Sequence, residues 1–361
     1  MTKSPNELPL KGRGAIGNRG GRFQKQAEEW FDDGWNSLQF ETLSPPKTLV
    51  FPDLSRTIVN KNQSPDIPFE QSINPYKGCE HGCIYCYARQ THSYLDLSPG
   101  LDFETKIFKK SQASELLDSF LRKKGYRCQP LCIGANTDPY QPIEKEHRVT
   151  RGLLEVLARF RHPVSIITKS ALVLRDLDIF QDLAKDRLVK IFVSVTTLNA
   201  TLAHQLEPRA AAPHRRLDVL AKLHEKGIPT GVMAAPMIPA LNDFELEKII
   251  EAAAKAGVET AGYIFIRLPH EVKDLFRDWL QTHYPDRAAH VMSLIQQSRN
   301  GSDYVAEFGE RMRGTGAYAQ LLRKRFEVCL RRYGIAKDSP ALNTQLFSVP
   351  SRPGDQLNLF S

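Results

Sequence analysis

The amino-acid sequence predicts an α/β fold built around a largely parallel sheet. Short apolar stretches alternate with amphipathic helical stretches between residues 70 and 270, the pattern of strands joined by crossover helices. The expected strands are short and mostly apolar, as strands buried on both faces are. No G-x-G-x-x-G sequence follows the first strand, which argues against an open dinucleotide-binding sheet. The alternation itself allows either a barrel-like or a doubly wound arrangement.

The expected elements follow one another with short connections. Strands are predicted at residues 71–75, 104–108, 130–135, 164–168, 190–196, 230–235 and 262–268. Helical periodicity places helices at 113–124, 150–160, 177–185, 215–226 and 244–256. Leu217, Leu220 and Leu223 share one face of their helix, and Gly227 and Gly257 are suited to end helices. Beyond residue 268 the pattern is helical, at 270–283, 287–297 and 317–333.

These elements suggest four segments. Residues 1–69 form a basic N-terminal arm and an irregular wrap, of which the first 25 residues are expected to be mobile because they have little apolar periodicity. Residues 70–270 form the α/β region, 271–334 a helical extension and 335–361 a polar, proline-containing tail.

The chain is basic, with 49 Lys and Arg against 41 Asp and Glu in 361 residues. Seven of the basic residues lie between Arg311 and Tyr333, where Glu327 is the one acid. Such a stretch permits a polyanionic partner, but it is more often a solvated face. No apolar run is long enough to cross a membrane and no secretory leader is recognisable, so we expect a cytosolic protein without a membrane partner.

Three of the six cysteines form the most informative feature: Cys79, Cys83 and Cys86. Without a secretory leader they are not expected to form disulfides. Three close thiolates suit an iron–sulfur cluster, and a set of three leaves one iron open to another ligand. The alternatives are a structural zinc site completed by His81 or His92, or a group of buried thiols.

The longer string NPYKGCEHGCIYCYAR, at residues 74–89, resembles the radical S-adenosylmethionine superfamily. It is most similar to the branch that contains spore photoproduct lyase and the DNA repair photolyase-like proteins. This resemblance implies a partial (β/α)6 barrel with an irregular N-terminal and a helical C-terminal extension. It also implies a [4Fe-4S] cluster on the three cysteines, S-adenosylmethionine as cofactor and a reducing electron donor. The implied chemistry is reductive cleavage of S-adenosylmethionine to a 5′-deoxyadenosyl radical, which abstracts hydrogen from a substrate.

The resemblance assigns the cofactor-binding residues position by position. Thr137 and Asp138 match a hydroxyl–carboxylate pair at the cofactor amino group, and Lys169 matches a lysine at its carboxylate. Tyr85 would lie against the adenine. Ser194 and Thr196, on the same side of one strand, suit ribose or carboxylate contacts, and Arg209 could hold an anionic group. For Thr137 and Asp138 the alternative is a turn that leads into a helix, and for Lys169 and Arg209 solvation or a surface ion pair.

The sequence departs from the lyases at the hydrogen-donor position. Spore photoproduct lyases have a cysteine close to the hydroxyl–carboxylate pair, whereas this chain has Gly134, Ala135 and Asn136 there. Cys132 is the remaining candidate donor, although strand alternation turns it away from its odd-numbered neighbours. Reversal of a thymine lesion is therefore not inferred.

The last residues, QLNLFS at 356–361, resemble the peptide that binds bacterial sliding clamps. Leu357, Leu359 and Phe360 would fill an apolar groove and Gln356 would hydrogen-bond at its rim; the alternative is a tail folded onto its own domain. With the clamp peptide, DNA becomes the favoured substrate and DNA repair or base modification the favoured function. The alternatives are a radical enzyme acting on RNA or protein, and a zinc- or cluster-stabilised nucleic-acid-binding adaptor.

Overall fold

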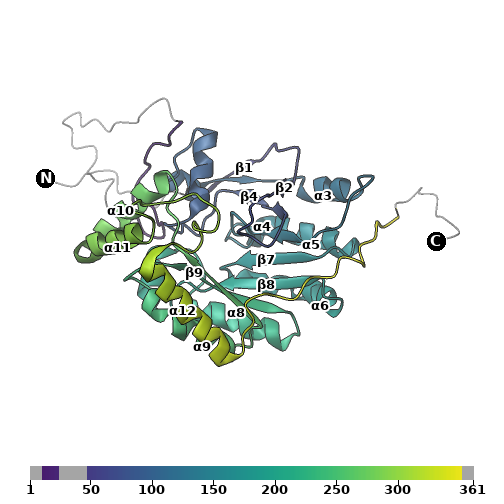
Figure 1. Cartoon of the computed structure of the whole chain (residues 1–361). Coiled ribbons are helices and arrows are strands. Elements are labelled where there is room, and N and C mark those ends of the chain that lie inside the picture. Colours follow the sequence, from purple (N-terminus) through teal and green to yellow (C-terminus); the bar gives the residue numbers. More distant parts are fainter. Residues whose placement is uncertain (1–9, 24–46, 352–361) are drawn as a thin grey trace, which may run out of the picture.

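The computed structural model describes residues 10–23 and 47–351. Its main sheet has the strand order β10-β9-β8-β7-β6-β3-β2 and is not closed into a barrel (Figure 1). Neighbouring strands are parallel except that β2 is antiparallel to β3. The strands are β2 (Val59–Lys61), β3 (Gln71–Ile73), β6 (Leu131–Ile133), β7 (Val164–Thr168), β8 (Val189–Ser194), β9 (Thr230–Met237) and β10 (Thr260–Phe265). The predicted α/β partial-barrel class is confirmed.

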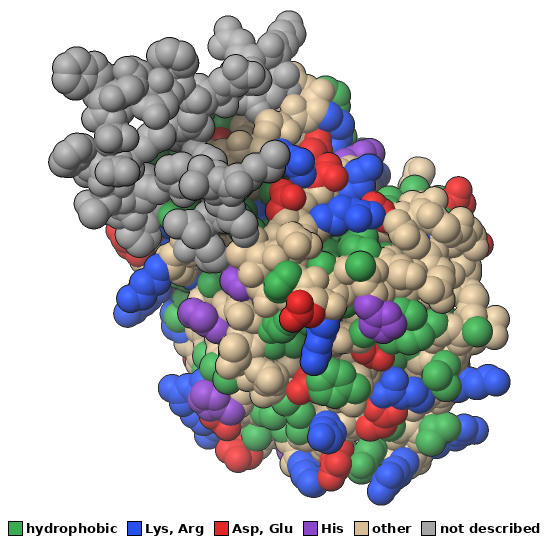
Figure 2. Space-filling model, turned by 90° about the vertical axis from the view of Figure 1, so that its left-hand side faces the viewer, with side chains coloured by type: hydrophobic (Ala, Val, Ile, Leu, Met, Phe, Trp, Pro, Cys, Tyr) green, Lys and Arg blue, Asp and Glu red, His purple; other side chains and the backbone are tan. Residues whose placement is uncertain are grey.

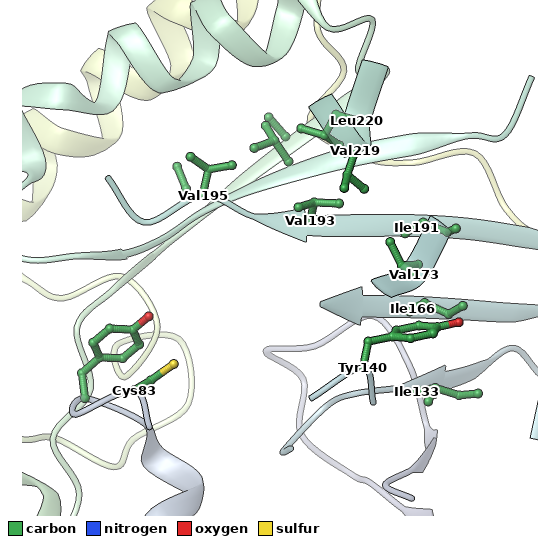
Figure 3. Close-up of a cluster of buried hydrophobic side chains, with 14 of the residues drawn as sticks. Cys83, Ile133, Tyr140, Ile166, Val173, Ile191, Val193, Val195, Val219 and Leu220 are labelled. Atoms are coloured by element: carbon green, nitrogen blue, oxygen red, sulfur yellow. The ribbon is translucent and has the colours of Figure 1, made fainter. Parts of the chain in front are cut away.

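Helices connect the parallel strands and cover one face of the sheet. They include α3 (Ala113–Leu121), α4 (Glu144–His147), α5 (Val149–Arg159), η3 (Ala171–Asp176), α6 (Leu177–Lys185), α7 (Ala200–Leu206), α8 (Pro213–Glu225), η4 (Asp243–Glu245) and α9 (Leu246–Lys255). Ile133, Ile166 and Ile191 lie side by side on three neighbouring strands and are fully buried (Figure 3). Gly257 follows α9 at a positive φ of 82°, and a Cβ there would meet the His224 ring at 2.4 Å, so glycine is required.

The opposite face of the sheet carries more polar side chains. Cys132, Ser165 and Lys190 are register partners on β6, β7 and β8. Because side chains alternate along a strand, this row faces away from the isoleucine row. The helix-free face is therefore the interior of the partial barrel.

A second, three-stranded sheet lies outside the main one. Its order is β1-β5-β4, with β1 at Leu49–Pro52, β5 at Lys106–Lys109 and β4 at Tyr76–Lys77. The predicted strand 104–108 is therefore wrong in its placement. Residues Leu101–Thr105 form the short helix α2, and the strand that follows joins the small sheet.

The described part of the N-terminal arm is not free. Arg13, Gly14 and Ala15 are buried, and the Gly14 and Ala15 amides donate to the carboxylate of Glu104 at 3.0 and 2.8 Å. The expectation of a mobile arm is wrong for these residues, because backbone amides as well as basic side chains hold them in place.

The C-terminal extension is helical, with α10 (Glu271–His283), α11 (Pro285–Gln297) and α12 (Gly316–Tyr333). Between α11 and α12 the chain meets the loop that leads from β2 to β3. The Arg311 guanidinium pairs there with the Asp66 carboxylate at 2.5 Å, and the Gly309 amide donates to the same carboxylate. This contact links the chain beyond β10 with the chain beyond β2, across the open side of the sheet.

The tail beyond α12 runs back along the sheet. Phe347 packs against Phe160 and His162, and the Ser348 amide donates to the Phe160 carbonyl at 3.1 Å. Phe160 and His162 immediately precede β7, so the tail is held at the amino ends of the strands. In Figure 1 it leaves on the side opposite to the strand arrowheads. Within the described ranges, no helix is both long and apolar enough to cross a membrane.

Candidate active site

The three cysteines lie on one compact loop at the carboxyl end of β3. Gly78 and Gly82 in this loop have φ values of +82° and +67°, which strongly favour glycine. A Cβ on Gly82 would also lie 2.7 Å from a carboxylate oxygen of Glu104. The Cys79 amide donates to the Phe103 carbonyl at 2.9 Å, and the Ile84 amide to the Leu206 carbonyl at 3.0 Å. The loop is therefore fixed from both sides.

Burial makes the three thiols poor acids in the absence of a metal. Cys79 and Cys83 are 6% and 9% exposed. Burial is the main cause that raises the pKa of Cys79, Cys83 and Cys86, and the Asp138 carboxylate raises that of Cys79 further. A bound cationic metal centre displaces such protons and compensates buried thiolates. By its chemistry the donor set, three sulfurs on one buried loop, suits a [4Fe-4S] cluster with one iron left open. Among the described residues, however, no three Cys, His or acidic side chains stand close enough together to hold a metal ion.

The two histidines expected as alternative zinc ligands are buried and each has a close polar contact, but the Nδ1 atom of each makes no well-aligned hydrogen bond among the described residues. His81 is 2% exposed and its Nδ1 lies 3.3 Å from the Asp138 carboxylate. His92 Nε2 lies 2.9 Å from the Lys106 carbonyl, and its ring packs edge-on against Phe103. Burial lowers the pKa of His92 to about 4, as in a neutral core histidine.

Arg209 belongs to an acid network that holds the start of the cysteine loop. Its guanidinium pairs with the Glu80 carboxylate at 2.9 Å, and its amide donates to the His81 carbonyl. The other Glu80 oxygen accepts the Ile143 amide at 2.8 Å. In this arrangement Arg209 positions the loop through a buried acid, which differs from the surface ion pair expected as its alternative. Its contact with an anionic group of the cofactor stays a prediction.

Asp138 forms a second network with the same loop. Its carboxylate accepts the Thr168 hydroxyl and the Lys169 amide, each at 2.7 Å, and faces His81. Burial opposes ionisation, but His81 and these hydrogen bonds outweigh it and lower the pKa of Asp138. The neighbouring Thr137 donates to the Tyr76 carbonyl at 2.7 Å. Both residues lie at the site edge, and their contact with the cofactor stays a prediction.

Glu207 is the centre of the third network, and it was missed as a site residue in the sequence. It is 2% exposed and accepts hydrogen bonds from Tyr85, Thr196 and Arg216. Burial raises the pKa of Glu207, although Arg216 opposes the shift. Two features distinguish Glu207 from an ordinary surface acid: its burial and its pairing with Arg216, nine residues later. Neither can be recognised from the sequence, because residue type does not reveal burial.

The Glu207 network brings together four of the predicted cofactor residues. The Lys169 ammonium lies 4.0 Å from the Glu207 carboxylate and 5.9 Å from the centre of the Tyr85 ring. Thr196 donates to Glu207 at 2.6 Å, and the Ser194 carbonyl accepts Arg216 at 3.1 Å. Lys169, Tyr85 and Thr196 therefore converge beside Cys83 and Cys86, whereas Ser194 lies one step behind them.

Cys132 is fully buried in the middle of the sheet. Burial raises its pKa to about 12, while Ser165 and Lys190 oppose the shift. The register partner of Cys132 on β7 is Ser165, in the row that faces away from the isoleucines. The thiol thus faces the interior side, and its role as hydrogen donor stays a prediction.

On the face that Figure 2 shows, Lys and Arg side chains are interspersed with Asp and Glu, so this face is not a continuous basic surface. Of the predicted basic stretch, Arg311 pairs with Asp66, Arg323 with Glu327 and Arg325 with Glu247. At these three arginines the basic stretch is therefore neutralised by ion pairs.

Comparison with known proteins connects this geometry to a family. Residues 73–253 match the model of the radical SAM superfamily. An uncharacterised protein of Mycobacterium tuberculosis is 30% identical over 75% of this chain and 77% of its own length. An uncharacterised protein of Methanocaldococcus jannaschii is 29% identical over 59% of this chain and 76% of its own.

Solved structures share the fold. Spore photoproduct lyase complexed with dinucleoside spore photoproduct superposes with a TM-score of 0.57 and 15% identity, over 79% of this chain and 78% of the lyase chain. A doubly substituted form of the lyase with bound AdoMet and the same dinucleoside gives a TM-score of 0.51 at 16% identity, over 79% and 77% of the two chains.

Proposed function

Because this chain belongs to the radical SAM superfamily, we propose that it is a radical enzyme whose substrate is a nucleic acid, DNA in the first instance, and that it repairs or modifies a base. The observation that carries the enzyme assignment is the buried loop with Cys79, Cys83 and Cys86 at the carboxyl edge of a parallel sheet. Polar residues that follow β6, β7 and β8 meet the loop at this edge, where α/β enzymes place their sites.

The family implies a [4Fe-4S] cluster on the three cysteines and S-adenosylmethionine beside it. When bound, they supply the reductive cleavage of S-adenosylmethionine to a 5′-deoxyadenosyl radical. Lys169 offers a cation for the cofactor carboxylate. Its ammonium lies 4.0 Å from the Glu207 carboxylate, so this ion pair is loose and the cofactor carboxylate could also bind to the ammonium. Glu207 holds Tyr85 and Thr196 in place, and the buried networks around the loop exclude water from the reacting centre.

The nucleic-acid substrate rests on two supports. Spore photoproduct lyase, which shares the fold, is known in complex with a dinucleoside lesion. The peptide at 356–361 resembles a clamp-binding sequence. The absence of a cysteine among Gly134, Ala135 and Asn136 separates this chain from the lyases, so the proposal names no particular lesion.

We also propose the bacterial sliding clamp as a partner of Gln356, Leu357, Leu359 and Phe360. These residues lie outside the part of the chain that the structure describes. The described tail before them is fixed at Phe347, so a peptide beyond it starts from a defined point at the amino edge of the sheet.

The test of the catalytic proposal is anaerobic reconstitution followed by an assay for 5′-deoxyadenosine with DNA, RNA and protein substrates. We expect about four irons per chain and 5′-deoxyadenosine formation that DNA stimulates. Cys83→Ala should lose iron and activity, whereas Cys329→Ala should keep both because Cys329 lies on α12. Zinc in place of iron would favour the adaptor, and stimulation by RNA or protein alone would move the substrate class.

A further inference from the structure

Arg267 lies just beyond β10, at the same edge of the sheet as the cysteines. Its guanidinium carbon lies 4.7 Å from the centre of the Tyr87 ring, and Tyr87 directly follows Cys86. The Tyr87 hydroxyl in turn donates to the Ala135 carbonyl after β6. Arg267 therefore reaches from the last strand of the sheet to the cysteine loop, across the open side of the partial barrel.

The charge of Arg267 is not compensated within the described residues. No carboxylate of residues 10–23 and 47–351 forms an ion pair with it, whereas the nearby Arg311 pairs with Asp66. Among the described residues, the one side-chain acceptor that it meets is the Met312 sulfur, at 3.6 Å, which is a weak acceptor. Its Nε atom is buried and has no hydrogen-bond partner. A half-buried guanidinium so placed is costly unless an anion joins it.

A second arginine adds to the positive potential. Arg299 is 1% exposed, and its guanidinium donates to the carbonyls of Ile266 and Glu310, both at 2.8 Å. Burial is the main cause that lowers the pKa of Arg299 to about 10, and the charge of Arg267 lowers it further. Carbonyl oxygens take up the terminal nitrogens of Arg299, while its Nε, like that of Arg267, is buried without a partner among the described residues. Because Arg299 is fully buried and Arg267 only half-buried, Arg267 is the one of the two that a ligand can reach.

We propose that Arg267 binds a phosphodiester group of the substrate next to the cysteine loop. This inference rests on the proposed nucleic-acid function and names the residue that would recognise the backbone. A guanidinium offers two parallel N–H donors to a phosphate, and stacking on an aromatic ring fixes the plane of the fork. The Tyr87 ring thus orients Arg267, and a phosphate bound there would place the adjoining nucleoside beside Cys86.

The test is binding of a fluorescein-labelled single-stranded DNA 12-mer to the full chain, with Arg267→Gln, Arg267→Lys and Arg287→Gln as variants. Arg287 is an exposed arginine of α11 with no ion pair among the described residues, so it is the matched control. Loss of one charge-assisted contact should raise Kd about tenfold for Arg267→Gln. The slope of log K against log salt should fall by about one. Arg287→Gln should bind as the wild type does, within about twofold.

A neutral methylphosphonate placed at successive positions of the 12-mer identifies the contact. One position should weaken binding to the wild-type protein, while the same position should have no effect on Arg267→Gln. Arg267→Lys keeps the charge but loses the fork, so it should bind with intermediate affinity. Iron content and S-adenosylmethionine binding should be unchanged in all variants.

Two contrary results are distinguishable. If the wild type binds the 12-mer and Arg267→Gln binds it equally, the assignment of Arg267 is wrong while the nucleic-acid proposal stands. If the wild type, with its cluster and S-adenosylmethionine bound, does not bind the 12-mer, the DNA substrate itself is wrong, and this inference with it.

Discussion

Arg89 and Glu104 form an ion pair of 2.5 Å in which neither side chain is exposed. Arg89 also donates to the carbonyls of Cys83 at 2.8 Å and Gly82 at 2.9 Å, and its Nη1 donates to those of Pro99 and Gly100. The remaining acceptor capacity of Glu104 is taken by the Gly14 and Ala15 amides. One buried pair thus links the N-terminal segment, α2 and the backbone of the cysteine loop at Gly82 and Cys83.

Replacing Arg89 by alanine should therefore damage the cysteine loop. It leaves the Glu104 carboxylate buried without its cation, a change that costs about 3–5 kcal/mol. We expect a large loss of thermal stability and an iron content well below that of the wild type. Differential scanning fluorimetry and iron analysis after anaerobic reconstitution measure the two effects.

Arg323→Ala is the control for the Arg89 experiment. Arg323 pairs with Glu327 on the surface of α12, with 52% and 41% of the two side chains exposed. Such a pair contributes less than about 1 kcal/mol. If Arg89→Ala kept full iron content, the ion pair would not be what holds the loop.

Lys169→Ala should weaken S-adenosylmethionine binding at least about tenfold, because it removes the cation expected at the cofactor carboxylate. Its iron content should remain normal, since Lys169 is no ligand of the cluster. Equilibrium dialysis with radiolabelled cofactor measures the affinity, and Lys185→Ala, at a 75% exposed side chain, is the control. Equal affinity in both variants would remove Lys169 from the cofactor site.

Acidification should destabilise the protein through His162. Burial lowers the pKa of this histidine to about 4 from 6.5, so the folded state favours its neutral form. The unfolded chain takes up the proton first as pH falls, and stability that is present above pH 6.5 is lost toward pH 4. Between pH 7 and pH 5 the loss is about 2 kcal/mol.

The comparison of wild type with His162→Gln isolates this effect. The glutamine variant is expected to be less stable at pH 7. The His162 ring packs against Phe347, and its Nε2 forms a hydrogen bond of 2.7 Å with the Tyr126 hydroxyl. Its free energy of unfolding should depend less on pH between 7 and 5. Parallel urea titrations at both pH values measure the difference, and identical pH slopes would contradict the assignment.

The clamp proposal predicts that a peptide of residues 350–361 binds purified sliding clamp with micromolar affinity, since a flexible peptide loses freedom on binding. A peptide with Leu359→Ala and Phe360→Ala should lose binding. In the full chain the same changes should leave iron content and S-adenosylmethionine cleavage intact. Fluorescence anisotropy with both peptides is the measurement; equal binding by the two would refute the role of these side chains.

The main sheet was predictable because its signal is local. The strands at 164–168 and 230–235 were foreseen nearly to the residue, since apolar runs bounded by helical periodicity report burial directly. The cysteine loop was also foreseen, because its three ligands lie close together in the sequence. Both successes rest on information within a short window of the chain.

The remaining features depend on contacts between distant residues. Gly14 and Glu104 are 90 residues apart, and the glycine- and arginine-rich composition around Gly14 looks the same whether it is solvated or buried. Glu104 itself was assigned to a strand of the main sheet. Burial of Glu207 and the pairing of Arg209 with Glu80 are likewise set by tertiary packing, which residue type alone does not specify.

The N-terminal segment also bears on how the protein is made. The family match begins at residue 73, yet the cysteine loop is covered by Gly14 and Ala15, and Arg22 pairs with Glu271 at 2.9 Å. During synthesis Gly14 and Ala15 leave the ribosome long before their partner Glu104, and Glu271, the partner of Arg22, leaves it later still. We therefore expect the loop to reach its final enclosure only when most of the chain has left the ribosome. Insertion of iron would then belong to a late, largely completed polypeptide, and a chain trimmed to residues 73–253 would lack the segment that encloses the cysteines.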